Sequence, residues 1–176
     1  MYKTTNGGQS WDSLFTKVVI GKGVAIHAMS FTDVDNGVIA GVGASFTTDG
    51  GHTWNKAYTE TNYPEAIQFF NDTLGYMVGW YSTTFGTIGT LDQTTDGGKQ
   101  WLPFFYPQKI PNDLYVTHLK MKAISFPSAR VGWIGGERYP GNTGYPNSRI
   151  LRTLDSGQTF DTVSQVLPHT VNCIGL

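Results

Sequence analysis

The chain has 176 residues with 12 basic and 13 acidic side chains, so its formal net charge is −1. A nucleic-acid-binding protein needs a surplus of Lys and Arg to neutralise phosphates, and this balance argues against that class. The apolar runs are far shorter than the roughly 20 residues of a membrane-spanning helix, which argues against membrane insertion. With 14% aromatic residues and 22 glycines, the composition indicates a folded, turn-rich chain rather than a disordered one.

An eight-residue motif occurs four times, at residues 4–11, 47–54, 94–101 and 153–160. Each copy begins with Thr, continues through a turn with glycine and ends on an aromatic residue. The third and last positions of the four copies are Asn6 and Trp11, Asp49 and Trp54, Asp96 and Trp101, and Asp155 and Phe160. An Asp or Asn in a turn accepts hydrogen bonds from nearby backbone N–H groups, and glycine supplies positive φ angles. We therefore expect a tight β-hairpin at each copy.

A second pattern lies between the motifs: a short apolar segment, a polar turn and an apolar segment flanked by glycine. It occurs at residues 25–41, 66–79 and 122–136, and residues 171–176 resemble its beginning. The two patterns together give four short strands in each unit of roughly 40–50 residues, which is the signature of a β-propeller.

The sequence thus predicts an all-β fold, an incomplete β-propeller of three full four-stranded blades with partial blades at both ends. The expected full blades are residues 24–58, 64–106 and 119–167, and the partial blades are residues 1–16 and 170–176. All of them are expected to form a single domain, residues 1–176. Propellers usually have 4–8 blades, so we expect either a piece of a longer propeller or a ring completed by self-association. A closed ring of four blades, one of them three-stranded, is the remaining alternative.

The eight-residue motif resembles the Asp-box, or bacterial neuraminidase repeat, with Asn6 replacing Asp in one copy and Phe160 replacing Trp in another. Asp-box repeats occur in sialidases, xyloglucanase-like glycosidases, sortilin-type receptors and the assembly factor of photosystem II. The combination of the motif with Gly75–Gly79 and Gly132–Gly135 most resembles the assembly factor of photosystem II and related bacterial secreted repeat proteins, with sortilin-like repeat proteins beside them. The resemblance implies a propeller in which the Asp and aromatic residues of the motif are structural. One carboxylate per motif is too few for a calcium site, which needs 6–8 oxygens.

Strand alternation places every motif on one rim of the propeller and the longer loops on the opposite rim, where binding residues concentrate. Long loops are expected at residues 80–92 and 137–149, and long connections between blades at residues 58–63 and 104–118. The candidate ligand-binding residues on this rim are Trp80, Tyr81, Tyr106, Tyr115, His118, Glu137, Arg138, Tyr139, Tyr145 and Arg149. Tyr, Trp and Arg dominate protein-interface hot spots, and aromatic faces also stack on sugars.

The first strand of each blade is expected to line a central channel. Alignment of these strands places four residues in equivalent positions: His27, Ala66, Lys122 and Asn172. The four histidines of the chain are scattered, so no metal site and no cofactor are expected.

Catalysis is not expected either. The resemblance to sialidases implies an arginine triad drawn from several blades, but all four arginines fall within one predicted blade: Arg130, Arg138, Arg149 and Arg152. A glycosidase that uses two carboxylates has candidates in Glu60, Glu65, Asp113 and Glu137, without a matching motif.

The sequence therefore favours a non-catalytic interaction or assembly scaffold that binds a protein partner through the long-loop rim. The alternative is a carbohydrate-binding module, with a glycan as partner, or a fragment of a two-carboxylate glycoside hydrolase. The composition suits an extracytoplasmic or secreted setting, although the sequence contains no signal-peptide pattern.

Overall fold

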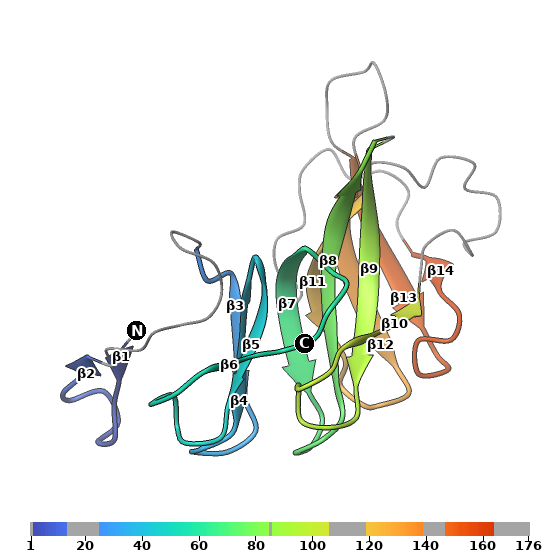
Figure 1. The fold of residues 1–176 in the computed structure, drawn as a ribbon. Helices are drawn as coiled ribbons and strands as arrows, with labels where there is room; N and C mark the ends of the chain where they lie inside the picture. The colour runs from blue at the N-terminus through green and yellow to red at the C-terminus, as the bar shows by residue number, and fades with distance from the viewer. Residues whose placement is uncertain (1, 14–24, 85, 106–118, 139–146, 164–176) are drawn as a thin grey trace.

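The computed structural model describes residues 2–13, 25–84, 86–105, 119–138 and 147–163. Within these ranges the chain forms three four-stranded antiparallel sheets and one two-stranded hairpin, with no helix. The three sheets stand side by side, in chain order, like the blades of a propeller (Figure 1). This arrangement confirms the predicted all-β, partial-propeller fold. No helix that could cross a membrane occurs in the described ranges.

The strand order in each four-stranded sheet follows the chain order. The first sheet contains β3 (Ala28–Phe31), β4 (Gly37–Gly41), β5 (Gly43–Thr47) and β6 (Asn55–Lys56). The second contains β7 (Tyr63–Phe69), β8 (Gly75–Thr83), β9 (Gly86–Thr94) and β10 (Leu102–Phe105). The third contains β11 (Leu119–Ser125), β12 (Gly132–Arg138), β13 (Asn147–Thr153) and β14 (Asp161–Thr162). The N-terminal hairpin pairs β1 (Tyr2–Lys3) with β2 (Asp12–Ser13), and the predicted C-terminal partial blade lies outside the described residues.

A phenylalanine lies directly on a glycine in every four-stranded sheet. The pairs are Phe31 on Gly37, Phe69 on Gly75, and Phe126 on Gly132. A Cβ atom on any of these glycines would overlap the aromatic ring, so a larger residue there must displace it. The same glycines pair with the Thr that opens each repeated motif, namely Gly37 with Thr47, Gly75 with Thr94, and Gly132 with Thr153. The first three strands of each sheet therefore share one register, set at the glycine.

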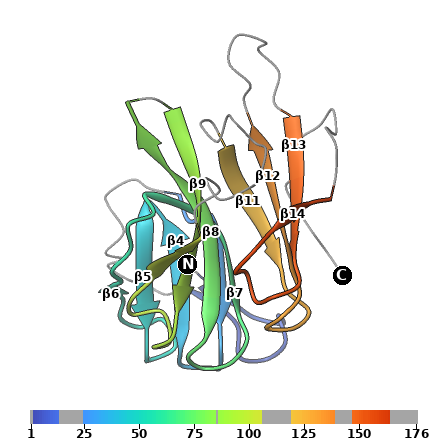
Figure 2. The same ribbon diagram turned by 90° about the vertical axis from the view of Figure 1, so that its right-hand side faces the viewer.

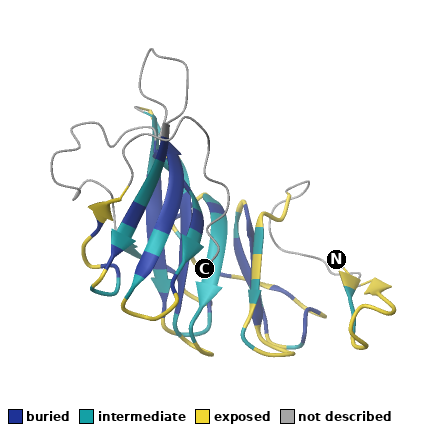
Figure 3. Ribbon diagram, turned by 180° about the vertical axis from the view of Figure 1, so that it is seen from behind, coloured by how far each residue is buried: buried dark blue, intermediate teal, exposed yellow. Residues whose placement is uncertain are grey.

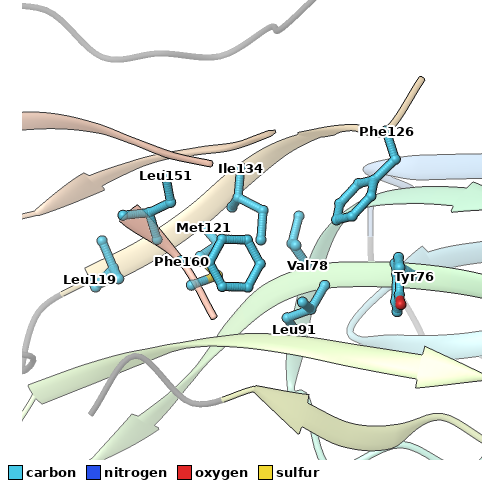
Figure 4. Close-up of a cluster of buried hydrophobic side chains, with 9 residues drawn as sticks. All are labelled: Tyr76, Val78, Leu91, Leu119, Met121, Phe126, Ile134, Leu151 and Phe160. Carbon is cyan, nitrogen blue, oxygen red and sulfur yellow. The ribbon is translucent and has the colours of Figure 1, made fainter. Parts of the chain in front are cut away.

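Two apolar clusters join the sheets face to face. The cluster between the second and third sheets is drawn in Figure 4, where Val78 and Leu91 from one sheet meet Met121 and Ile134 from the other. Phe160, the last residue of the fourth motif, lies in that cluster and is 5% exposed. Trp101, the last residue of the third motif, lies in the cluster between the first and second sheets, with Val38, Ala40 and Met77. Burial of these large aromatic rings between sheets contributes much of the apolar area that holds the sheets together.

The repeated motifs form hairpin turns that satisfy their own polar side chains. In the second copy, Oδ1 of Asp49 accepts hydrogen bonds from the Thr47 hydroxyl at 2.8 Å and the Thr53 N–H at 2.8 Å. Oδ2 of Asp49 accepts one from the Thr53 hydroxyl at 2.6 Å. The Thr47 hydroxyl oxygen accepts one from the Gly51 N–H at 2.9 Å, and the Trp54 indole donates to the Gly51 carbonyl at 3.1 Å.

These hydrogen bonds, chiefly those from Thr53, lower the pKa of Asp49 to about 2. The fourth copy repeats the arrangement: the hydrogen bonds from Thr159, followed by that from Thr153, lower the pKa of Asp155 to about 2. In the first copy Oδ1 of Asn6 accepts from the Ser10 N–H at 3.0 Å, while its amide nitrogen donates to the Ser10 hydroxyl at 2.8 Å. An amide therefore fits the turn when the neighbouring hydroxyl acts as the acceptor.

The segment predicted as a long loop at residues 80–92 is largely strand, which corrects the sequence-based expectation. Strands β8 and β9 stay paired out to Thr83 and Gly86, so Trp80–Asp92 is a projecting hairpin (Figure 2). The residues near its tip include Ser82, Thr83, Thr87 and Ile88, and β-branched residues favour a continued ladder. In the third sheet the pairing of β12 with β13 likewise continues to Arg138 and Asn147.

The close approach of the first two sheets makes Gly98 intolerant of a side chain. Gly98 has φ +89°, and a Cβ atom there would overlap the Cγ2 atom of Val38 in the neighbouring sheet. Gly43 has a similar φ of +81° but open space around its Cα atom. We predict that Gly98→Ala lowers the free energy of unfolding by about 1–3 kcal/mol more than Gly43→Ala, because both carry the same backbone strain and only one is overpacked. Urea denaturation of the two variants measures the difference, and equal losses would contradict a tight contact between the sheets at Gly98.

Asp49 offers a second test, of the motif turn. We predict that Asp49→Ala destabilises the protein more than Asp49→Asn, because an amide keeps the acceptor atom that Asn6 uses in its own turn. The stabilising effect of the Asp49 carboxylate, relative to the amide of the Asp49→Asn variant, is present above the ordinary carboxyl pKa of 3.8 and is lost as the pH falls toward 2. Thermal unfolding between pH 2 and pH 6 measures both effects. A difference that is constant with pH would show that the carboxylate of Asp49 is not stabilised in the folded state.

Candidate functional site

Charged side chains gather on the first strands of the three sheets. Strands β3, β7 and β11 each form the same edge of their sheet, and β7 contacts both of the others. In β7 the pairing shifts between Pro64 and Ala66, and in β11 it shifts between Met121 and Ala123. Glu65 and Lys122 are therefore the extra residues of two β-bulges. A bulge leaves its extra residue outside the ladder and changes where its side chain points.

A glycine makes room for each bulge. A Cβ atom on Gly79 would overlap the Tyr63 carbonyl oxygen, and a Cβ atom on Gly136 would lie against the Lys120 carbonyl oxygen. Both glycines close the repeated Gly-flanked apolar segments of the sequence.

The position in β7 equivalent to His27 and Lys122 is Glu65, not Ala66. The expected alignment matched Phe70 to Phe31 and Phe126, but Phe69 is the residue that covers the glycine of the second sheet. The sequence Phe69-Phe70 allows both alignments, and only the register decides between them. The correction replaces a neutral side chain in the series with a carboxylate, and Asn172 lies outside the described residues.

From the first sheet to the third, the series runs from a basic to an acidic to a basic side chain: His27, Glu65 and Lys122. Nδ1 of His27 lies 3.7 Å from Oε2 of Glu65, so the contact joins the first and second sheets. Nζ of Lys122 lies 3.4 Å from Oε1 of Glu137, whose side chain is 7% exposed. Each of the two carboxylates thus has a cationic or basic partner.

An aromatic and cationic stack lies beside this series. The ring of Tyr63 stacks on that of Trp80, with a centroid distance of 4.0 Å and an interplanar angle of 16°. Nζ of Lys120, from the third sheet, lies 4.4 Å from the Trp80 ring centroid. A ring stacked at 4.0 Å covers one face of the indole, so the ammonium group occupies the other face. The Trp80 indole also donates a hydrogen bond to Oε1 of Glu65 at 3.0 Å. Both faces and the N–H group of Trp80 are therefore engaged within the chain, which leaves no open face for a sugar.

The structure brings together only some of the predicted rim residues. Trp80 and Tyr81 lie in β8, and Glu137 lies in β12. Arg138 ends β12 and Arg149 lies in β13, so these two also lie in strands rather than in a loop. Five predicted residues lie outside the described ranges: Tyr106, Tyr115, His118, Tyr139 and Tyr145.

Sequence reasoning did not single out Lys120 or Tyr63 as parts of one cluster with Trp80. Lys120 lies near the start of β11, far from Trp80 in the sequence, and no local pattern relates the two residues. The cluster combines basic and acidic side chains with the stacked rings of Tyr63 and Trp80. Among the described residues, no group of three or more His, Cys, Asp or Glu side chains is arranged to hold a metal ion.

A buried carboxylate anchors the connection between the first two sheets. Asp92, in β9, is 1% exposed, and its Oδ2 accepts hydrogen bonds from the Thr61 hydroxyl at 2.8 Å and the Thr59 hydroxyl at 3.1 Å. Burial raises the pKa of Asp92 to about 6; the two threonine hydrogen bonds oppose that change, and the charge of Glu60 adds to it. The connection also bonds to both sheets through its backbone, since the Tyr58 carbonyl accepts from the Trp101 N–H and the Asn62 carbonyl from the Gly43 N–H.

No protein-family model matches the chain. A protein from Synechococcus sp. (strain CC9902), named photosystem II assembly lipoprotein Ycf48, is 29% identical to the chain over 118 residues. The matched region covers 63% of this chain and 34% of that protein, so the chain spans about a third of the length of this relative.

Asp92 predicts a pH dependence of stability with a definite sign. A carboxyl whose pKa is raised from 3.8 to about 6 favours the folded state below pH 3.8, and that contribution is lost as the pH rises through 6. We predict that, as the pH rises from 4 to 7.5, the stability of Asp92→Asn relative to the wild type increases by about 2 kcal/mol, because the variant has no charge to bury. Urea denaturation of both proteins at the two pH values measures the change. Parallel pH profiles would show that the Asp92 carboxylate is not destabilised by its burial.

Proposed function

We propose that this chain is part of a non-catalytic Asp-box β-propeller that acts as an assembly scaffold and binds a protein partner. The observation that carries the proposal is the 29% identity over 118 residues to a protein named as a photosystem II assembly lipoprotein. An assembly factor binds protein subunits, so the partner class proposed here is a subunit of a multisubunit complex. The proposed setting is extracytoplasmic, which agrees with the lipoprotein named above and with the low charge content of this chain.

The geometry of the motif turns supports the assignment to the Asp-box family. In three copies the carboxylate of the motif accepts hydrogen bonds from the Thr that opens the motif and from the backbone near its end. Oxygen atoms used in this way are poor candidates for holding an external ion or substrate. The proposed role of these residues is to fasten the hairpin and to aim the closing aromatic residue at the neighbouring sheet.

The state of the described carboxylates supports a role without catalysis. A glycosidase needs two carboxyl groups that face the same sugar, one of them a general acid. Glu65 and Glu137 each contact a basic side chain, and Glu137 is 5% exposed. Asp92 has a raised pKa, as a general acid requires, but at 1% exposure it does not reach a glycosidic oxygen.

The proposed binding surface is the rim that carries the projecting β8–β9 hairpin and the Tyr63–Trp80–Lys120 stack. Tyr81 is partly exposed on that hairpin, and Ser82 and Thr84 are exposed near its tip. A paired strand hairpin with an aromatic side chain and nearby charges fits a protein surface. The engagement of both faces of Trp80 weighs against the glycan-binding alternative at this residue.

Two matched charge reversals test the proposed rim. Lys120 lies on the rim of the projecting hairpin, whereas Lys99 lies in a motif turn of the second sheet and is exposed. We predict that Lys120→Glu and Tyr81→Ala weaken binding to purified photosystem II subunits at least tenfold, and that Lys99→Glu leaves it unchanged. Isothermal titration calorimetry measures the affinities, and circular dichroism confirms that each variant is folded.

Equal effects of Lys120→Glu and Lys99→Glu would show that binding depends on the net charge of the chain and not on contacts with this rim. Saturable binding on a glycan array without binding to any protein subunit would favour the carbohydrate-binding alternative instead.

A further inference from the structure

A continuous chain of side-chain contacts crosses all three sheets near the rim of the projecting hairpin. Oε2 of Glu65, in the second sheet, lies 3.7 Å from Nδ1 of His27, which immediately precedes β3 of the first sheet. Oε1 of Glu65 accepts a hydrogen bond from the Trp80 indole at 3.0 Å. Nζ of Lys120, in the third sheet, lies 4.4 Å from the centroid of the Trp80 ring. The two oxygen atoms of one carboxylate thus have different partners, and Glu65 links the first sheet to Trp80 and Lys120.

The groups at the two ends of this chain are held by their own sheets. The His27 N–H donates a hydrogen bond to the Ala40 carbonyl at 2.8 Å, and β3 pairs with β4 without a register shift. His27 therefore moves with the first sheet. Lys120 lies in β11, which is paired with β12 of the third sheet. A shift of either sheet against the second one changes a contact that ends on Glu65 or on Trp80.

The bulge in β7 places Glu65 where it reaches a neighbouring sheet. Lys122, the extra residue of the bulge in β11, lies 3.4 Å from Glu137 and so contacts a residue of its own sheet. The side chain of Glu65 is 18% exposed, and Figure 3 shows the second and third sheets mainly as buried and intermediate residues, with exposure at the turns. A carboxylate that is largely removed from water depends strongly on the groups that contact it.

The hydrogen bond to Glu65 fixes the one direction in which stacking leaves Trp80 free. The Tyr63 ring covers one face of the indole, and the Lys120 ammonium group lies on the other. Contacts with the two faces hold the plane of the ring, but they oppose rotation within that plane only weakly. An N–H···O bond prefers a nearly linear arrangement, so it determines which part of the indole lies beneath the ammonium group.

We propose that Glu65 is a positioning residue of the rim, which fixes Trp80 and, through Trp80, the ammonium group of Lys120. Because Glu65 also contacts His27, this position depends on the packing of the first sheet. The inference rests on the proposed function, in which the rim with Lys120 contacts a protein subunit. Glu65 acts through its neighbours, since its two oxygen atoms are already engaged within the chain. The partner therefore meets a correctly placed cation when the three sheets are packed together.

Nuclear magnetic resonance tests the positioning without a partner. The indole N–H resonance of Trp80, assigned by its loss in Trp80→Phe, reports the hydrogen bond, and the ring shifts the side-chain resonances of Lys120. We expect Glu65→Gln, which keeps an oxygen acceptor, to preserve both shifts, and Glu65→Leu to lose both. Asp72→Leu is the matched control, because Asp72 is exposed in the turn between β7 and β8, at the opposite rim of the same sheet.

The link to the first sheet has its own spectroscopic signature. We expect His27→Ala to shift the indole resonance of Trp80 in the wild type and to leave it unchanged in Glu65→Leu, because the effect passes through the carboxylate. A shift of the same size in both proteins would show that His27 acts on Trp80 without Glu65. That result, or no shift in either protein, would overturn the coupling between the first sheet and the rim.

Binding measurements show whether the partner depends on this positioning. We expect Glu65→Leu and Trp80→Phe each to weaken binding to purified photosystem II subunits about tenfold or more. The double variant is expected to lose no more than either single variant, because both changes remove the same hydrogen bond. Glu65→Gln and Asp72→Leu are expected to bind like the wild type, and circular dichroism confirms that each variant is folded. If Glu65→Leu does not fold, Trp80→Phe still breaks the bond from its other side.

The outcomes separate this inference from the proposed function. Additive losses in the double variant, or a loss in Glu65→Gln equal to that in Trp80→Phe, would overturn the positioning role. If the wild type binds no subunit, the proposed function fails, and the resonances of Trp80 and Lys120 still decide the role of Glu65. Unchanged resonances in Glu65→Leu would overturn that role whether or not a subunit binds.

Discussion

The contact between phenylalanine and glycine at the start of each second strand is the constraint on which the sheets depend. The ring of the phenylalanine occupies the space that a side chain on the glycine would need, so the first two strands approach closely there. The same glycine pairs with the Thr that opens the motif turn. One residue without a side chain therefore aligns three strands and places the motif turn at a fixed height on its sheet.

The aromatic side chains at the ends of the motifs depend on that alignment. Because the turn has a fixed height, Trp101 and Phe160 meet the same level of the preceding sheet and fill the clusters between sheets. Gly98 lies in the same motif as Trp101, and because it has no side chain the motif turn packs directly against Val38. Trp11 closes the N-terminal copy and is 59% exposed, since the structure describes no sheet on its outer side.

The fold was predictable because its determinants are local and repeated. The motif turns need Thr, Asp or Asn and glycine at fixed spacing, and the sequence shows these residues four times. The extent of the strands was not predictable in the same way. Trp80–Asp92 contains polar and aromatic residues that suit a loop, but the pairing of β8 with β9 continues through them because both strands carry β-branched residues toward the tip.

The candidate site was predictable only in part, for two physical reasons. The register of β7 decides whether Ala66 or Glu65 joins His27 and Lys122, and two adjacent phenylalanines make the sequence ambiguous at that point. The contact of Lys120 with Trp80 arises from the packing of separate sheets, and no local pattern encodes it. Residue type alone therefore indicated a surface rich in Trp and Tyr, whereas the structure shows that Trp80 is already fully engaged.

The connection between β6 and β7 has a consequence for how such repeats are exchanged. Its backbone bonds to both neighbouring sheets, and its threonines bond to Asp92. A recombination point inside this connection would separate the residues that form these hydrogen bonds. A sheet transferred to another protein at that point would therefore lose part of the bonding that joins it to its neighbour. Recombination that leaves residues 57–62 with the strands on both sides preserves the joint intact. The module that can be exchanged without loss at this connection is therefore offset from the visible sheet, and its boundaries fall within the sheets rather than between them.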